Sequence, residues 1–337
     1  MKSIWILPAL LMGAAISAET AQNIVPRPSP VPIHRKVVTS LDDSGPGSLR
    51  EALNGSFRYV VFEVGGVIRL KSELKLTHHN VTIDGAAAPK PGITIVGKPF
   101  VIADVANIQI KHLRFRESSD DNLRISGACR NILIENCSST HGGDGAIDIT
   151  HDYKTGKRPT GIIIRNCLIG ATEKAMLVVG VDNLYIDHNL FTNNGQRNPQ
   201  LHDAKKFNVV NNLVRNWTVY GIRVRAGSTG NLIGNHVPLS PFLPKRPDRS
   251  MQVLKGDDSP AGVVYCAGNL GPEGFDADRQ GNCAQPVSPD LMATHEAREL
   301  EKVLASKVGA RPLDPVDQQL VENSLSIRPR PSMTKDK

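Results

Sequence analysis

A short segment that recurs at a nearly constant interval constrains the fold of this chain more than any other feature. Its first four occurrences are Asn107-Ile-Gln-Ile-Lys-His-Leu, Asn131-Ile-Leu-Ile-Glu-Asn-Cys, Gly161-Ile-Ile-Ile-Arg-Asn-Cys and Asn183-Leu-Tyr-Ile-Asp-His-Asn. The closing position falls at Leu113, Cys137, Cys167, Asn189, Asn212 and Asn235, in steps of 24, 30, 22, 23 and 23 residues. Self-similarity at a period of roughly 20–50 residues indicates a repeat architecture.

Each repeat unit is a β-branched run bounded by turn residues, without helical periodicity, so the units are built of strands. Two or three short strands per unit, stacked in parallel about 4.8 Å apart, predict an all-β right-handed parallel β-helix. We expect Asn189, Asn212 and Asn235 to form an inward ladder of side-chain amides, and the long step to hold a polar loop around Asp152–Arg158. A leucine-rich repeat or a β-sandwich with chance spacing is the alternative, which six approximate matches disfavour.

The N-terminal segments predict export. Residues 1–18 combine Lys2, an apolar run too short to span a bilayer and a small-residue end, which is typical of a signal peptide. Residues 19–35 contain four prolines and are expected to form an extended linker. No later stretch approaches 18 consecutive apolar residues, so we expect a secreted or periplasmic protein with no membrane attachment after cleavage.

The remaining chain is interpreted as one β-helix domain, residues 36–285, with capping appendages. Ser48 and Glu51 have the spacing of a capping box ahead of a short helix, which we expect to cover the open N-terminal end of the β-helix. Residues 286–326 are predicted to be a helical segment, with Asp314 as the N-cap of its second helix and Pro315 in the first turn. Residues 327–337 are a polar tail, and a monomer is expected.

The charge balance suggests an anionic partner. The chain has 40 basic and 33 acidic residues, a formal net charge of +7. A basic exported protein favours anionic ligands, and the absence of a basic cluster interleaved with aromatic residues disfavours nucleic acid. We therefore expect an acidic polysaccharide.

The five cysteines leave at least one thiol without an intramolecular partner. Cys266 and Cys283 flank a glycine-bearing loop and could form a disulfide in an oxidising compartment. Cys137 and Cys167 share one repeat position, and two buried thiols are favoured there over a disulfide.

Acidic and basic residues also recur at the interval of the repeat. When Leu123, Ile147, Met176 and Pro199 are aligned, one equivalent position is occupied by Asp121, Gly145 (beside Asp144), Lys174 and Arg197. If each step is one turn of a solenoid, two carboxylates, an ammonium and a guanidinium line one edge of a single groove.

The chemistry of these residues suits a uronate substrate. Asp121, Asp144 and Asp148 come from two successive turns, and calcium takes 6–8 oxygen ligands in flexible geometry. Solvated surface acids, or a carboxylate pair for glycoside hydrolysis, are the alternatives. Lys174 and Arg197 favour instead the removal of a proton α to a uronate carboxylate, whose growing negative charge calcium and Lys174 would stabilise.

Several segments, taken together and in order, resemble the pectate lyases of polysaccharide lyase family 1, in their bacterial exported branch. The resemblance covers about residues 37–325 and is carried by Ser44-Gly-Pro-Gly-Ser-Leu-Arg-Glu-Ala, Val81-Thr-Ile-Asp-Gly, Asp120-Asp-Asn-Leu-Arg-Ile, Asp144-Gly-Ala-Ile-Asp-Ile, Lys174-Ala-Met-Leu-Val-Val-Gly, Asp187-His-Asn-Leu-Phe, Arg197-Asn-Pro, Asn211-Asn, Asn216-Trp217 and Val308-Gly-Ala-Arg-Pro-Leu-Asp-Pro-Val-Asp.

This resemblance implies calcium-assisted β-elimination of α-1,4-polygalacturonate, giving a 4,5-unsaturated galacturonosyl end. It implies that Asp121, Asp144 and Asp148 bind calcium, that Lys174 binds the substrate carboxylate, and that Arg197 is the base, although guanidinium groups hold their proton strongly.

One position departs from the family pattern. Relatives usually carry a second arginine shortly after the catalytic one, where this chain has Gln200 and His202 as candidate substrate-binding residues. A β-helix that only binds acidic glycan, or has altered specificity, therefore stays open. A polygalacturonase-like hydrolase is disfavoured because no Gly-His-Gly or Arg-Ile-Lys occurs in the chain.

Overall fold

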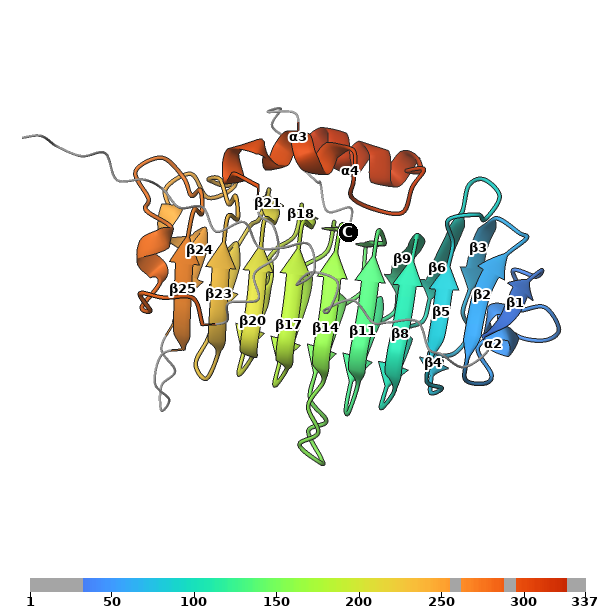
Figure 1. Cartoon of the computed structure of the whole chain (residues 1–337). Coiled ribbons are helices and arrows are strands. Elements are labelled where there is room, and N and C mark those ends of the chain that lie inside the picture. Colours follow the sequence, from blue (N-terminus) through green and yellow to red (C-terminus); the bar gives the residue numbers. More distant parts are fainter. Residues whose placement is uncertain (1–32, 255–261, 288–294, 326–337) are drawn as a thin grey trace, which may run out of the picture.

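The computed structural model describes residues 33–254, 262–287 and 295–325, and they form a right-handed parallel β-solenoid (Figure 1). The expected fold class, including the short N-terminal helix and the helical C-terminal appendage, is confirmed. The signal peptide, residues 19–32 of the linker and the 327–337 tail lie outside the described residues.

Three parallel sheets form the walls, and most turns of the solenoid pass through them in a fixed order. The ten-stranded sheet contains, in spatial order, β1 (His34–Val38), β2 (Arg58–Phe62), β5 (Val81–Asp84), β8 (Ala106–Lys111), β11 (Arg130–Glu135), β14 (Thr160–Arg165), β17 (Asp182–Asp187), β20 (Lys205–Val210), β23 (Thr229–Ile233) and β25 (Val263–Ala267). The chain next enters the seven-stranded sheet, which contains β3 (Gly66–Arg69), β6 (Ile93–Gly97), β9 (Leu113–Ser118), β12 (Ser138–Thr140), β15 (Leu168–Gly170), β18 (Leu190–Thr192) and β21 (Leu213–Arg215).

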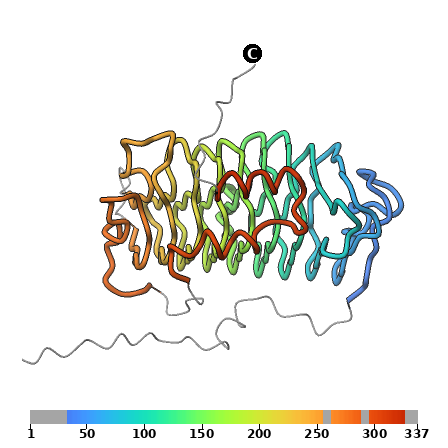
Figure 2. Tube along the Cα trace, turned by 90° about the horizontal axis from the view of Figure 1, so that it is seen from above, coloured from blue at the N-terminus to red at the C-terminus, as the bar shows by residue number. Residues whose placement is uncertain are grey.

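The eight-stranded sheet closes each turn. It contains β4 (Leu74–Leu76), β7 (Phe100–Ala103), β10 (Leu123–Ser126), β13 (Gly145–Thr150), β16 (Lys174–Val179), β19 (Gln200–His202), β22 (Ile222–Val224) and β24 (Met251–Val253). Figure 2 shows the turns stacked along one axis, so residues about one repeat apart in sequence are neighbours in space.

The strand register reproduces the predicted steps. Along the ten-stranded sheet, Ile108 pairs with Ile132, Ile132 with Ile162, Ile162 with Leu184 and Leu184 with Phe207, and all five side chains are buried. The extra residues of the long step form the loop between β13 and β14, which extends below β14 in Figure 1.

Left-handed backbone near both ends of each repeated segment, which form two corners of every turn, explains why the repeat can be recognised in the sequence. Each segment begins with a residue at positive φ, at Asn107 (61°), Asn131 (56°), Gly161 (67°) and Asn183 (50°), and its penultimate residue is left-handed too, as at His112 and Asn136. Glycine, asparagine and other short polar residues tolerate this region best. The β-branched residues between the corners alternate into the core.

The predicted asparagine ladder is confirmed and is longer than expected. Asn189 donates its side-chain amide to Asn212 Oδ1 at 3.0 Å, Asn212 donates to Asn235 at 3.0 Å, and Asn235 donates to Asn269 at 2.9 Å. The ladder ends where Asn269 donates to Asp278 Oδ1 at 2.8 Å. Each step satisfies polar groups that are out of reach of water.

Replacing Asn212 by alanine is therefore expected to destabilise the solenoid. The substitution leaves the buried backbone N–H of Asn189 without its acceptor, and the Asn189 side-chain amide keeps only its bond to the Ile164 carbonyl. Each buried unsatisfied donor costs about 1–3 kcal/mol. A lowered Tm in thermal unfolding checks this. The matched control is Asn131→Gly, which removes an amide pair with Asn107 from the exposed side of the ten-stranded sheet and keeps a residue suited to the left-handed backbone at this position. Equal Tm values for the two variants would contradict a special role for the ladder.

Helices cover one end and one wall of the solenoid. At the N-terminal end, α2 (Leu49–Ala52) is capped by Ser48 Oγ, which accepts the N–H of Glu51 at 3.2 Å as predicted, while the Glu51 carboxylate reaches back to the N–H of Gly47. At the other end of the chain, η3 (Ala297–Glu299), α3 (Leu300–Ala305) and α4 (Pro315–Leu325) lie over the seven-stranded sheet (Figure 1). None of the helices in the described ranges has the length and apolar character needed to cross a bilayer.

A buried ionic network fixes α4 to that wall. Asp314 accepts the N–H of Asp317 and is the N-cap, as predicted. The carboxylate of Asp317 is completely buried and accepts hydrogen bonds from Arg114 (3.2 Å), Arg116 (2.5 Å) and Ser138 (2.7 Å). All three donors stand on β9 and β12, so the network joins residues about 200 positions apart.

The cysteine thiols are all free. Cys137 and Cys167 are buried on adjacent turns, as favoured, and burial raises the pKa of Cys137 to about 12. Cys266 and Cys283 are not joined in the structure, so the disulfide considered from the sequence is not present.

Candidate active site

The sequence-predicted site residues gather where strands of the eight-stranded sheet begin. Asp121 lies two residues before β10, Asp144 one residue before β13, Lys174 opens β16, and Arg197 lies three residues before β19. Leu123 pairs with Ile147 and Ile147 with Met176, and Gly145 pairs with Lys174, which is the register that the repeat alignment predicts.

Arg197 departs from this alignment by one residue. Lys174 pairs with Gln196 rather than with Arg197, whereas Leu177 pairs with Gln200, so this turn holds one extra residue between the two pairs. The left-handed backbone of Arg197, with φ of 61°, accompanies the bulge. The prediction that Arg197 occupies the same position as Lys174 is therefore wrong by one residue.

Three carboxylates form a tight cluster at this edge. Oxygen atoms of Asp120, Asp121 and Asp144 lie within 4.8 Å of one another. The side chain of Asp121 is only 6% exposed, and its Oδ1 atom has no hydrogen-bond partner in the part of the chain that is described. An orphaned, buried carboxylate oxygen is rare in a folded protein and calls for an external partner.

Two cations hold the other oxygens of the cluster. Arg124 donates to Asp120 Oδ2 at 2.7 Å and to Asp121 Oδ2 at 3.3 Å, and Lys174 pairs with Asp144 Oδ1. Lys174 thus contacts an acid that was predicted to bind metal, while its side chain stays 30% exposed at the edge of the sheet.

Asp148 lies within β13, four residues after Asp144. Its Oδ1 atom accepts the backbone N–H of Leu177 at 3.3 Å. Burial, reinforced by the charge of Asp121, raises the pKa of Asp148 to about 7, although the nearby Arg197 opposes the shift. A further positive charge at this place would favour the ionised carboxylate.

The space between these acids suits a calcium ion. A Cβ atom at Gly145 would lie 2.6 Å from Asp121 Oδ1 and 3.4 Å from Asp148 Oδ1, so the absence of a side chain keeps this space open. The atoms around this space are carboxylate oxygens and the backbone carbonyl oxygen of Lys174, and oxygen is the ligand type that Ca²⁺ prefers. The unpartnered oxygen of Asp121 thus faces a place where a hard cation fits.

Arg197 is the least constrained cation of the group. Its half-buried guanidinium makes no hydrogen bond or ion pair with any described residue, although Asp148 and Tyr220 lie close enough for its charge to influence their pKa values. Gln200 is 9% exposed and accepts the phenol proton of Tyr220 at 2.6 Å, whereas His202 is exposed. Gln200 is therefore tied into a network and His202 is open to a ligand.

Sequence reasoning missed Asp120, Arg124 and Tyr220 as parts of this site. Asp120 and Arg124 flank Asp121 within one turn, and only the side-chain geometry shows that their charges meet. Tyr220 lies 23 residues after Arg197, so one more step of the repeat would have found it.

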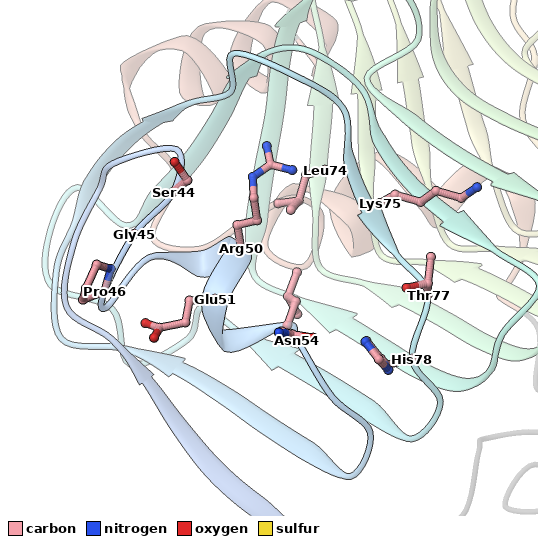
Figure 3. Close-up of a pocket in the computed structure, with 11 residues that line it drawn as sticks. Ser44, Gly45, Pro46, Arg50, Glu51, Asn54, Leu74, Lys75, Thr77 and His78 are labelled. Atoms are coloured by element: carbon pink, nitrogen blue, oxygen red, sulfur yellow. The ribbon is translucent and has the colours of Figure 1, made fainter.

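A separate pocket of about 510 Å³ lies beside α2 and β4, and Figure 3 shows its lining. Arg50 and Glu51 of α2 line it together with Lys75 and His78. Arg50 is already paired with Asp43 at 2.7 Å and donates to three backbone carbonyls. We therefore assign this pocket to the N-terminal cap and not to the acidic cluster.

Comparisons with known sequences agree with the repeat. Residues 100–241 match a family model described as a right-handed beta helix region. The chain is 31% identical over 209 residues to a probable pectate lyase C of Aspergillus flavus, covering 59% of this chain and 48% of that protein. It is 28% identical over 247 residues to a probable pectate lyase 18 of Solanum lycopersicum, covering 64% and 57%. The chain thus spans about half the length of these curated relatives.

Solved structures share the fold at low identity. Jun a 1, the major allergen from cedar pollen, superposes with a TM-score of 0.68 at 20% identity, covering 82% of this chain and 88% of that one. Pectate lyase Bsp165PelA from Bacillus sp. N165, solved in complex with trigalacturonate, gives a TM-score of 0.65 at 15% identity, covering 82% and 93%. In its aligned sequence and in its fold, the chain is therefore similar to pectate lyases.

Proposed function

We propose that this protein is a pectate lyase that cleaves α-1,4-polygalacturonate by calcium-assisted β-elimination. The observation that carries the proposal is the cluster of Asp120, Asp121 and Asp144 beside Lys174 and Asp148, together with an Arg197 guanidinium that pairs with no described residue. The carboxylates alone would suit a metal ion, and the Lys and Arg side chains alone would suit any anion. Their combination suits a substrate that carries a carboxylate beside an acidic C–H bond.

In this proposal, each residue has a defined task. Lys174 and His202 bind and orient the carboxylate of the sugar residue that reacts. Arg197, whose side chain has no partner among the described residues, removes the proton from C5 in its neutral guanidine form. The C5–H electrons then form the C4=C5 double bond, the C4–O bond breaks, and the leaving oxygen takes a proton from water, while Arg197 returns its added proton to water. Gln200, held by Tyr220, would line the groove beside this sugar.

Asp121, Asp144 and Asp148 would hold Ca²⁺, with Asp120 beside them. When bound, the ion supplies positive charge that stabilises the carboxylate as negative charge accumulates on it. The same proposal covers the finer assignments made from the sequence: a secreted or periplasmic member of the bacterial exported branch that acts as a monomer on acidic polysaccharide. The charge of the chain and the export-like N-terminal sequence support it.

The test is incubation with polygalacturonate at alkaline pH, with calcium and then with chelator. We expect ultraviolet absorbance from the new double bond, conjugated with the carboxylate, only when calcium is present. Reducing ends without this absorbance would indicate a polygalacturonase-like hydrolase. Retained binding without any product would indicate a non-catalytic glycan-binding protein.

Replacing Asp148 by alanine is expected to weaken calcium binding by about tenfold or more, because one carboxylate oxygen leaves a site of few ligands. Isothermal titration with CaCl₂ in the absence of substrate measures this directly. Asp152→Ala is the control, since Asp152 caps its own exposed loop through the N–H groups of Lys154 and Thr155. Unchanged calcium affinity in Asp148→Ala would remove Asp148 from the metal site.

A further inference from the structure

A row of outward-facing side chains crosses the ten-stranded sheet, the wall that faces the reader in Figure 1. In the middle of the row, Gln109 pairs with Leu133, Leu133 with Ile163, and Ile163 with Tyr185, on β8, β11, β14 and β17. Successive side chains of a strand point to opposite faces of the sheet. Because Ile132, the residue before Leu133, lies in the core, Leu133 and its partners point away from the core.

These outward side chains are nevertheless buried. Leu133 and Ile163 have no exposed surface, and Tyr185 is only 8% exposed. The three form an apolar cluster separate from the core, which we call the outer strip, and no other apolar residue of the described ranges packs in it. Gln109 and Tyr185 each have an interaction partner as well. The C-terminal helices bury a different cluster, on the seven-stranded sheet. The outer strip is therefore covered, and the described residues supply no apolar cover for it.

The chain between Val287 and His295 is too short to cover the whole strip. The N–H of Val287 donates to Asn231 on β23, and the N–H of His295 donates to Asn211, which follows β20. A path from β23 to β11 and back to β20 crosses seven strand spacings, about 34 Å at about 4.8 Å each. The eight peptide steps from Val287 to His295 span at most about 29 Å. Leu133 therefore has another cover.

The chain that precedes β1 has the necessary reach and chemistry. β1 is the edge strand of the same sheet, and β14 and β17 lie five and six strand spacings from it, about 24 and 29 Å. Ile24 and Val25 precede Ile33 by nine and eight residues, about 25–30 Å in an extended or polyproline chain. The prolines that follow them favour such a chain, which docks on apolar and aromatic surfaces with little loss of entropy.

We propose that residues 24–32 dock on the outer strip, with Ile24 and Val25 against Leu133, Ile163 and Tyr185. The proline-rich segment then belongs to the folded domain, where it shields an apolar surface that would otherwise favour association between copies of the chain. Its prolines have no N–H group that would need a partner there. The inference does not depend on the proposed lyase activity, because the acidic cluster lies on the eight-stranded sheet.

Hydroxyl-radical footprinting of the whole chain, read by mass spectrometry, tests the docking. The labelling of a side chain rises with its exposure, and Tyr153, which is 69% exposed, is the internal reference. We expect weak labelling of all three residues of the outer strip in the parent chain. In Ile24→Asp/Val25→Asp, docking would bury carboxylates without partners. We therefore expect the labelling of the strip to rise severalfold, while that of Tyr153 stays the same.

Two control variants carry the same kind of paired change elsewhere. Leu291→Asp/Met292→Asp alters the internal segment considered above, and Ile327→Asp/Met333→Asp alters the C-terminal tail. Neither is expected to raise the labelling of Leu133.

Three results overturn the inference. The first is labelling of the outer strip in the parent chain as strong as that of Tyr153. The second is a rise at Leu133 in either control variant and none in Ile24→Asp/Val25→Asp. The third is protection that disappears on dilution, which would indicate that a second copy of the chain covers the strip. Circular dichroism establishes that the variants fold, and Ile24→Ser/Val25→Ser decides the question if the aspartate variant does not.

Discussion

Replacing Arg197 by lysine is expected to lower kcat on polygalacturonate by about 10²–10⁴-fold, the usual contribution of a positioned acid–base group. The substitution keeps the positive charge but replaces a planar, forked group by a compact ammonium on a flexible stem. Because the side chain of Arg197 makes no hydrogen bond or ion pair with the described residues, little of the fold depends on it. Initial rates of double-bond absorbance at saturating substrate and calcium measure the effect.

Three comparisons make this result interpretable. Thermal unfolding should give the same Tm for Arg197→Lys and the wild type. Arg298→Lys, at an exposed position paired with Glu296, should keep full activity. Titration with trigalacturonate should show that the variant still binds, so that the loss lies in kcat rather than in affinity. Turnover within a fewfold of the wild type would remove Arg197 from the role of base.

Replacing Asp317 by alanine is expected to give the largest loss of stability. The carboxylate is fully buried, and the substitution strips Arg114 and Arg116, themselves buried, of an anionic partner. Breaking one side of a buried ion pair costs about 3–5 kcal/mol. We expect a clearly lower Tm, and earlier protease cleavage near α4, which the network fixes to the wall.

The control for this variant is Glu322→Ala on the exposed face of the same helix, where the lost contact is a hydrogen bond from Gln318. A Tm loss no larger than that of the control would contradict the network.

Lowering the pH is expected to weaken the same buried ionic network by protonating Asp314. Burial alone would raise the pKa of Asp314, but hydrogen bonds and charge from Arg116 lower it below the usual 3.8. The stabilisation is therefore complete above about pH 4 and is lost as the pH falls through the depressed value.

Much of the fold could be predicted because the left-handed corners constrain the sequence as strongly as the core does. Asparagine, glycine or histidine returns at most of these left-handed positions, with Lys206 as an exception, and Ile or Leu returns between them, so the step lengths can be read from the sequence. The asparagine ladder followed from the same alignment. The ion pairs of Asp317 with Arg114 and Arg116 could not be predicted in this way. They depend on how the C-terminal helix packs against the solenoid, and such contacts do not recur periodically in the sequence.

The site was predictable where it follows the register and not where it departs from it. Asp121, Gly145 and Lys174 align as the repeats do. The bulge at Arg197 shifts one residue without disturbing the pattern on either side, so spacing alone cannot detect it.

The order of strands in the eight-stranded sheet bears on how local unfolding would affect the site. In a solenoid each turn contacts only its neighbours, so opening starts at an end and spreads inward one turn at a time. The strands from β10 to β19 have β4 and β7 on one side and β22 and β24 on the other. Loss of a terminal turn would thus leave the acidic cluster and its two cations intact, and activity should outlast the first structural changes on heating.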